Sequence, residues 1–169
     1  MNLPKNVTLG LFTWDSSTFN EAGNSELDIE ISKWGESTEA QFISYAVQPI
    51  GVDPVYAERM KRVAVFEPAL LNGQSTHEID WSPQRVILRS YQGQDKSEDH
   101  LIAEWQFTDQ NPPRKKTENI VQSLPFVIPA PGKNTHARIN FWVQSGQSAG
   151  PIGGQSQEVV ISKFEYVAH

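Results

Sequence analysis

The chain has 169 residues, 14 of them basic and 20 acidic, for a formal net charge of −6. Its length predicts one domain over residues 1–169, long enough to build a hydrophobic core. The excess of acid and the lack of a basic stripe argue against nucleic-acid binding. The absence of cysteine excludes disulfides, zinc–thiolate sites and cysteine nucleophiles.

In chain order, short apolar alternations are separated by segments rich in Gly, Pro, Ser and Asn, as expected for strands and turns. Residues 55–66 could begin as a helix after Pro54, but a loop followed by a strand fits better. The basic run 114–116 falls in a polar loop, 108–118, where charge is most simply solvated. The strands predicted with more definite patterns cover residues 7–14, 25–34, 41–47, 75–81, 85–91, 101–107, 126–128, 137–143 and 158–167.

These strands are short, and no long helical period occurs between them. Segments 75–81 and 85–91 are joined by a Ser-Pro turn signal and form a predicted hairpin. No apolar run is long enough to cross a membrane, and the first residues do not have the apolar centre of a signal peptide. The pattern predicts an all-β protein, an antiparallel β-sandwich.

The segment 25–31 has the most unusual charge pattern. Successive side chains of a strand point to opposite faces, so Glu26, Asp28 and Glu30 share one face and branched apolar residues share the other. Like charges on one face repel, which raises the pKa of some of them. Such a group can supply one carboxylic acid and one carboxylate near neutral pH.

Strand spacing alone leaves the reaction type open. The α-carbons of Glu26 and Glu30 are about 13 Å apart at roughly 3.3 Å per residue. Two carboxyl groups that act on one bond lie about 5–5.5 Å apart when one of them is the nucleophile, and about 6.5–9.5 Å apart when one of them activates a water. Both side chains would have to lean toward each other, and the spacing does not decide between the two outcomes.

The sequence Glu26–Glu30 resembles the Glu-x-Asp-x-Glu motif of glycoside hydrolase family 16, which includes endo-β-1,3-glucanases, lichenases, agarases and carrageenases. The neighbouring segments 10–14, 77–83, 140–142 and the last strand resemble family segments in the same order. The resemblance implies a jelly roll of the concanavalin A-like lectin/glucanase type. It also implies retention, with Glu26 as nucleophile, Glu30 as acid/base and Asp28 assisting both. The motif has no inserted bulge residue, as in lichenases, which points to mixed-linkage or related β-glucans. The substrate that the resemblance implies is a β-1,3- or β-1,3-1,4-glucan.

Several further residues are candidates for substrate binding. The aromatic rings could stack on sugars or pack in the core, and Asn140 could bind a sugar hydroxyl or make a structural contact. His77 is expected beside the substrate and not on a metal, because no second His or Cys lies at ligand spacing. Glu78 and Asp80 lack a third acid and are expected to be structural. The substrate-binding candidates are Trp14, Trp34, His77, Trp105, Asn140 and Trp142.

The resemblance also implies what accompanies the domain. Family members carry further strands before the segment that begins here near Leu3, so the chain is expected to be short at its N-terminus. We expect a polysaccharide substrate, an extracellular or periplasmic location for the parent protein, no required cofactor and a monomer unless open sheet edges associate. A structural calcium ion is compatible with the family but is not predicted. The alternatives are a non-catalytic lectin-like module and an inactive remnant.

Overall fold

The computed structural model describes residues 3–18, 23–50, 59–66, 73–110, 114–117, 120–123, 126–144 and 150–168. Strands dominate these residues, and the predicted all-β class with antiparallel pairing is confirmed. The helical elements that the structure describes are single 3-10 turns, η1 (Ser16–Thr18), η2 (Gly23–Ser25) and η4 (Glu98–His100). In the same ranges, no helix has the length and apolar character needed to cross a bilayer.

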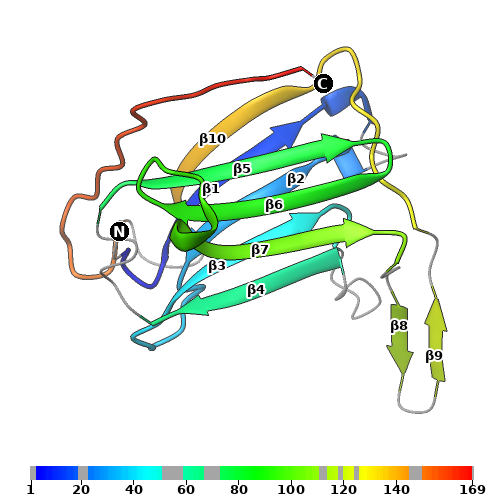
Figure 1. The fold of residues 1–169 in the computed structure, drawn as a ribbon. Coiled ribbons are helices and arrows are strands. Elements are labelled where there is room, and N and C mark those ends of the chain that lie inside the picture. Colours follow the sequence, from blue (N-terminus) through cyan, green and yellow to red (C-terminus); the bar gives the residue numbers. More distant parts are fainter. Residues whose placement is uncertain are drawn as a thin grey trace.

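The larger sheet has five strands among the described residues, in the order β10-β1-β2-β3-β4, and all of its neighbours are antiparallel (Figure 1). Its strands are β1 (Val7–Trp14), β2 (Leu27–Ser32), β3 (Gln41–Val47), β4 (Met60–Val65) and β10 (His136–Val143). The acidic strand is shorter than predicted, since Glu26 lies just before β2 and Trp34 just after it. Segment 55–66 was predicted to be a loop followed by a strand. Residues 55–58 lie outside the described residues, and the predicted strand corresponds to β4.

The second sheet lies in front of the first in Figure 1 and, in the described ranges, has the order β5-β6-β7. Its strands are β5 (Ser75–Ser82), β6 (Arg85–Gln92) and β7 (Leu101–Thr108). The predicted hairpin is confirmed as β5 and β6, in which Ser82 pairs with Arg85 across the turn.

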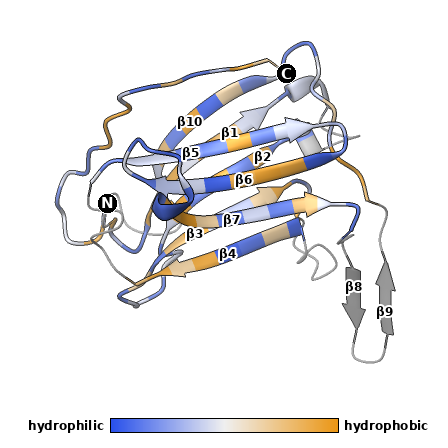
Figure 2. Cartoon of the chain, viewed as in Figure 1, coloured by the Kyte–Doolittle hydropathy of each residue, from blue (hydrophilic) through white to orange (hydrophobic). Residues whose placement is uncertain are grey.

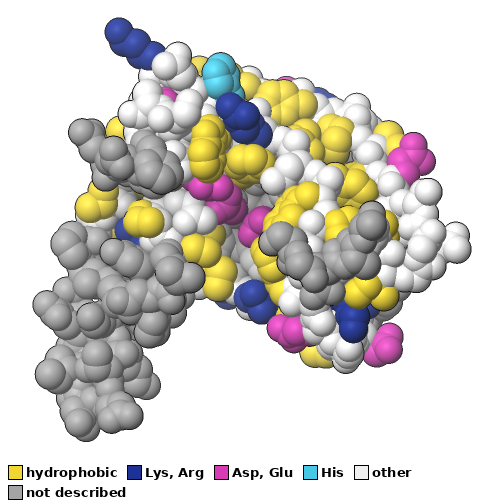
Figure 3. All heavy atoms as spheres, turned by 180° about the vertical axis from the view of Figure 1, so that it is seen from behind, with side chains coloured by type: hydrophobic (Ala, Val, Ile, Leu, Met, Phe, Trp, Pro, Cys, Tyr) yellow, Lys and Arg dark blue, Asp and Glu magenta, His cyan; other side chains and the backbone are white. Residues whose placement is uncertain are grey.

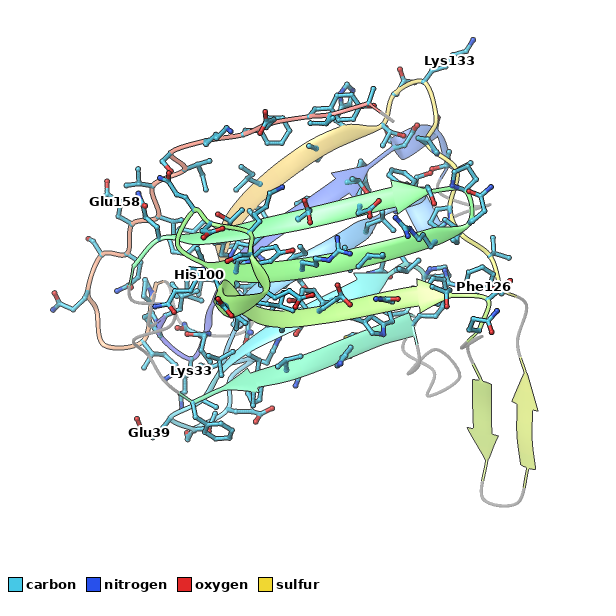
Figure 4. All side chains as sticks on the ribbon, in the orientation of Figure 1. Lys33, Glu39, His100, Phe126, Lys133 and Glu158 are labelled. Atoms are coloured by element: carbon cyan, nitrogen blue, oxygen red, sulfur yellow. The ribbon has the colours of Figure 1, made fainter. Side chains whose placement is uncertain are left out.

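The core lies between the two sheets and is built from alternate residues of each strand. Figure 2 shows the corresponding alternation of apolar and polar residues along the strands. Ile29 and Ile31 of β2 are fully buried, as are Val86 and Leu88 of β6. Phe126, labelled in Figure 4, extends the core at the end of β7, where its ring centroid is 4.9 Å from that of Phe107. Burying the apolar face of β2 fixes its register and sends its acidic side chains to the outer face of the larger sheet.

Three predictions about local structure were wrong. The expected loop 108–118 contains β8 (Arg114–Thr117), which pairs with β9 (Ile120–Ser123) in a hairpin that stands apart from both sheets in Figure 1. Residues 126–128 form no strand. Segment 158–167 has strand-like alternation but pairs with no described strand, and Tyr166 remains 81% exposed. Propensity alone does not form a strand, because pairing needs a free edge in register.

Candidate functional site

The outer face of the larger sheet carries the carboxylate triad, which we define as Glu26, Asp28 and Glu30. Asp28 and Glu30 project from β2, opposite in phase to the buried Ile29. Asp28 is only 5% exposed although it is on an outer face, which means that neighbouring side chains cover most of it. Figure 3 views the molecule from behind the larger sheet and shows acidic side chains near the middle of this side, between hydrophobic groups.

Glu26 is held beside the strand by the backbone around it. Ser25 takes a left-handed conformation with φ 51°, and its hydroxyl donates to the Ala130 carbonyl at 2.8 Å. The Thr13 hydroxyl donates to the Ser25 carbonyl at 2.8 Å and accepts from the Leu27 N–H at 3.0 Å. The Glu26 carbonyl accepts from the Gln48 N–H at 3.0 Å. These bonds fix the bend from which the Glu26 side chain reaches Asp28.

The strand register aligns the triad with side chains from the other four strands. Each row runs across the sheet from β10 to β4, and its members share the outer face. The first row contains Asn140, Gly10, Glu30, Ser44 and Arg62. The second row contains Arg138, Phe12, Asp28, Ala46 and Met60. Residues far apart in the chain are therefore brought to both sides of the acidic groups.

Burial raises the pKa of all three carboxyl groups, because it disfavours their charged forms. The pKa of Glu26 rises to about 8, through burial first and then the charge and hydrogen bond of Asp28 and the charge of Glu30. The pKa of Glu30 rises to about 7, through burial and the charge of Asp28, partly opposed by Arg62. The three groups therefore do not all ionise at neutral pH.

Asp28 is the acceptor at the centre of the triad. Burial raises its pKa to about 6, while hydrogen bonds from Gln48 and Glu26 act in the opposite direction. The Gln48 side-chain amide donates to Asp28 Oδ2 at 3.0 Å. The bond between Glu26 and Asp28 needs one proton between two carboxyl groups. This arrangement can hold a proton at the site near neutral pH, which general acid catalysis requires.

Most of the predicted substrate-binding residues lie on the same outer face. Trp14 pairs with His136 of β10 and makes an edge-to-face contact with Phe12, at 6.4 Å between ring centroids. Trp142 pairs with Thr8, and its indole N–H is buried with no hydrogen-bond partner among the described residues. Asn140 is exposed and lies beside Gly10, in the row of Glu30.

Trp34 joins this face from the turn after β2. Its backbone has φ 52°, which is a rare conformation for a bulky residue and costs about 1–3 kcal/mol. Two hydrogen bonds hold it there, from its N–H to the Ser32 hydroxyl at 3.0 Å and from its indole N–H to the Ser44 hydroxyl at 3.1 Å. The seven candidates that share the outer face are Glu26, Asp28, Glu30, Trp14, Trp34, Asn140 and Trp142.

The structure separates His77 and Trp105 from this group, which corrects their expected place beside the substrate. His77 lies on the inner face of the second sheet, where its ring nitrogens lie 3.0 Å from the Ser75 hydroxyl and 2.8 Å from that of Ser90. Burial lowers the pKa of His77 to about 4, so its neutral form is favoured. Trp105 packs against the core, 5.8 Å from the Phe107 ring.

The predicted structural role of Glu78 and Asp80 agrees with their positions on the outer face of the second sheet. Arg89 lies 3.1 Å from Glu78, 3.8 Å from Asp80 and 2.6 Å from Glu104. Lys96 also contacts Glu78 at 2.6 Å. These five charged residues form a network of ion pairs on the surface of the second sheet.

Two residues of the outer-face site, Gln48 and Arg62, were missed in the sequence. Gln48 follows β3, and nothing in its local sequence signals a contact with Asp28. Arg62 lies in β4 between Met60 and Ala64, and this alternation could have shown that the three residues share a face. The two sequence segments reach the triad only after β2, β3 and β4 pair in this register.

No family model, curated protein or solved structure matches the chain. The resemblance to glycoside hydrolase family 16 therefore depends on the sequence motif and its neighbours alone. In the part of the chain that the structure describes, no group of three or more His, Cys, Asp or Glu side chains is arranged to hold a metal ion.

Proposed function

We propose that the protein is an endo-acting β-glycan hydrolase that uses the carboxylate triad in a retaining double displacement. The single observation that supports this most is the recessed position of Glu26, Asp28 and Glu30 on one outer face, where each has a raised pKa. A strand with three acids on a fully solvated face would not produce such shifts. The resemblance to family 16 supplies the reaction class and the jelly-roll topology, both of which are part of this proposal.

In the proposed first step, the ionised Glu26 attacks the anomeric carbon and forms a glycosyl ester. The bond from that carbon to the glycosidic oxygen breaks, and Glu30 gives its proton to the departing oxygen. In the second step, Glu30 takes a proton from water, whose oxygen attacks the anomeric carbon and releases Glu26 as a carboxylate. The sum of both steps is hydrolysis, with the anomeric configuration retained.

The proton states of the triad suit the role of Glu30 as an acid, but they require Glu26 to lose a proton before it can act as nucleophile. A pKa near 7 keeps a large fraction of Glu30 protonated at neutral pH, as a general acid needs. Glu26 must lose its proton before it can attack, and the hydrogen-bonded Asp28 is the acceptor beside it. We therefore assign Asp28 the role of holding the shared proton while Glu26 is ionised.

The expected substrate is a neutral β-1,3- or β-1,3-1,4-glucan, and we place the reaction at an extracellular or periplasmic site of the parent protein. Aromatic rings favour the apolar faces of sugars, and Trp14, Phe12 and Trp142 share the face of the triad. The asparagine at position 140 provides a donor and an acceptor for hydroxyl groups. We expect the catalytic form to be a monomer unless open sheet edges associate.

A non-catalytic carbohydrate-binding module is a second candidate, and one observation favours it. Burial and the neighbouring acids raise the pKa of Glu26 above that of Glu30, which leaves the proposed nucleophile protonated at neutral pH in the free protein. A protein that only binds sugars could use the aromatic rings without an ionised nucleophile. An inactive remnant would show neither binding nor hydrolysis.

Reducing-sugar release from laminarin, lichenan, agarose and xyloglucan tests the proposal, with Glu26→Gln as control. Proton NMR of the first products reports the anomeric configuration, and retention is expected. With an activated aryl glycoside, azide should restore turnover in Glu30→Ala and give the β-glycosyl azide, whereas Glu26→Ala should give the α-azide. If the protein binds glycans but releases no reducing sugar from any of them, the hydrolase proposal is wrong and the carbohydrate-binding module is favoured.

A further inference from the structure

We propose that Arg62 is a positioning residue that sets the ionisation of Glu30, and that Trp34 and Phe42 hold its guanidinium in place. This inference deepens the proposed function, because Glu30 is the acid/base in that scheme. No sequence motif assigns a role to Arg62. Its place follows from the pairing of β2, β3 and β4.

The register places Arg62 within reach of Glu30. Glu30 pairs with Ser44, and Ser44 pairs with Arg62, so the three residues form one line across the outer face. Adjacent strands lie about 4.8 Å apart, which puts the α-carbons of Glu30 and Arg62 roughly 10 Å apart. The intervening Ser44 is small and only 1% exposed, so the long arginine side chain can extend over it toward the triad.

Two aromatic rings fix the guanidinium. Its central carbon lies 5.6 Å from the ring centroid of Trp34 and 5.4 Å from that of Phe42. Both distances fall within the range of a cation–π interaction. The indole of Trp34 is itself anchored by the Ser44 hydroxyl at 3.1 Å, so the position of Arg62 is linked to the residue between it and Glu30.

The unusual backbone of Trp34 is explained by this arrangement. A left-handed φ of 52° at a tryptophan persists only where the surroundings hold it. Here the Ser32 hydroxyl accepts from the Trp34 N–H at 3.0 Å, and the next residue, Gly35, donates to the Lys5 carbonyl at 2.6 Å. The turn thereby directs the indole back over β3, where it contacts Arg62.

Among the described residues, Arg62 is the cation whose charge affects the pKa of Glu30. Asp28 on the same strand opposes ionisation of Glu30, and the charge of Arg62 favours it. Across β1 and β10 the row offers only the uncharged Gly10 and Asn140. Glu26, on the other side of Asp28, also interacts with Glu30 through its charge. The exposed Glu36 contacts Arg62 at 3.3 Å and competes for it.

A carbon-13 NMR titration of the Glu30 carboxyl tests this inference directly and needs no enzymatic activity. In Arg62→Met, which keeps an unbranched apolar side chain but removes the charge, the pKa of Glu30 should rise by about half a unit to one unit. Arg62→Lys keeps the charge but not the planar contact with the rings, so it should give a smaller rise. The control Arg85→Met removes a cation paired with Asp80 on the other sheet and should leave the Glu30 pKa unchanged.

An unchanged Glu30 pKa in Arg62→Met would overturn the inference, as would an equal rise in Arg85→Met. If Arg62→Met does not fold, Phe42→Leu removes one ring and should still raise the Glu30 pKa. If the wild type hydrolyses a glycan, the alkaline limb of kcat/KM should move to higher pH in Arg62→Met. Absence of hydrolysis would defeat the proposed function alone, because the NMR shift is measured independently.

Discussion

The side-chain oxygen of Asn140 occupies the space that a β-carbon on residue 10 would take, so Gly10 is what allows Asn140 to lie across β1 toward Glu30. The close approach involves the end of an exposed side chain that can rotate away. A substitution at Gly10 should therefore change the position of Asn140 more than the stability of the sheet.

For Gly10→Ala, we expect the free energy of unfolding to change by less than about 1 kcal/mol, because alanine is favoured over glycine in a strand and offsets part of the crowding. Glycan affinity or turnover should fall about as much as in Asn140→Ala. The double variant should be no worse than Asn140→Ala alone, since both changes remove the same contact. Urea unfolding and glycan titrations measure these effects, and additive losses would contradict the explanation.

Glu30→Gln should stabilise the protein increasingly as the pH rises. The pKa of Glu30 is about 7 in the folded protein and near 4.5 when unfolded, so the native state binds more protons between these values. Wild-type stability due to this group is complete below pH 4.5 and is lost as the pH rises through 7, by up to about 3 kcal/mol. Glutamine resembles the protonated acid and avoids this loss.

Thermal unfolding of wild type and Glu30→Gln at several pH values would show this difference. Glu104→Gln is a control with the opposite sign, because hydrogen bonds from Gln106 and Arg89 lower the pKa of Glu104. That variant should lose stability at neutral pH and approach wild type in acid. A constant difference between Glu30→Gln and wild type from pH 4 to 9 would disprove the pKa argument.

His77 should contribute to acid sensitivity. Its pKa is about 4 in the folded protein against about 6.5 in the unfolded chain, so the unfolded state binds more protons between these values. Stability is therefore lost as the pH falls from 6.5 to 4. In His77→Gln, which retains polar atoms for Ser75 or Ser90, calorimetry should show a smaller loss over that interval. His136→Gln, at an exposed position of β10, should behave as wild type.

Trp14 and Trp105 should respond differently to replacement by alanine. Trp105 packs against the core, so Trp105→Ala should lower the free energy of unfolding by about 3 kcal/mol. Trp14 lies on the outer face, where Trp14→Ala should cost about 1 kcal/mol and weaken glycan binding at least tenfold. Chemical unfolding and affinity electrophoresis on lichenan separate the two effects. Equal glycan affinity in Trp14→Ala and wild type would exclude stacking at this position.

The main strands and the triad could be predicted because period-2 alternation is a local property of the sequence. It placed the acids of β2 on one face whatever the neighbouring strands were. The same rule, applied to β5, puts His77 in phase with Ile79 and Trp81, which pack against the core, so the sequence pattern also indicates an inner-face position for His77. Trp105 likewise shares its phase with Phe107.

Other features depend on pairing between distant segments and could not be predicted from local patterns. Arg62 reaches Glu30 only because β3 lies between their strands in one register. Segment 158–167 alternates as a strand should, but alternation does not show whether a partner edge is available. The hairpin of β8 and β9 was missed because the charged residues 114–116 obscure its pattern.

The two sheets differ in width among the described strands, and this affects how the protein can be handled. Ile139 and Phe141 point to the inner side of β10, yet they remain 47% and 37% exposed, and Phe164 and Tyr166 are more exposed still. A fluorescent dye such as ANS, which binds exposed apolar surface, should therefore stain the folded protein. Dye-based melting curves would start from a high baseline, so circular dichroism is the better measure of unfolding for the variants described above.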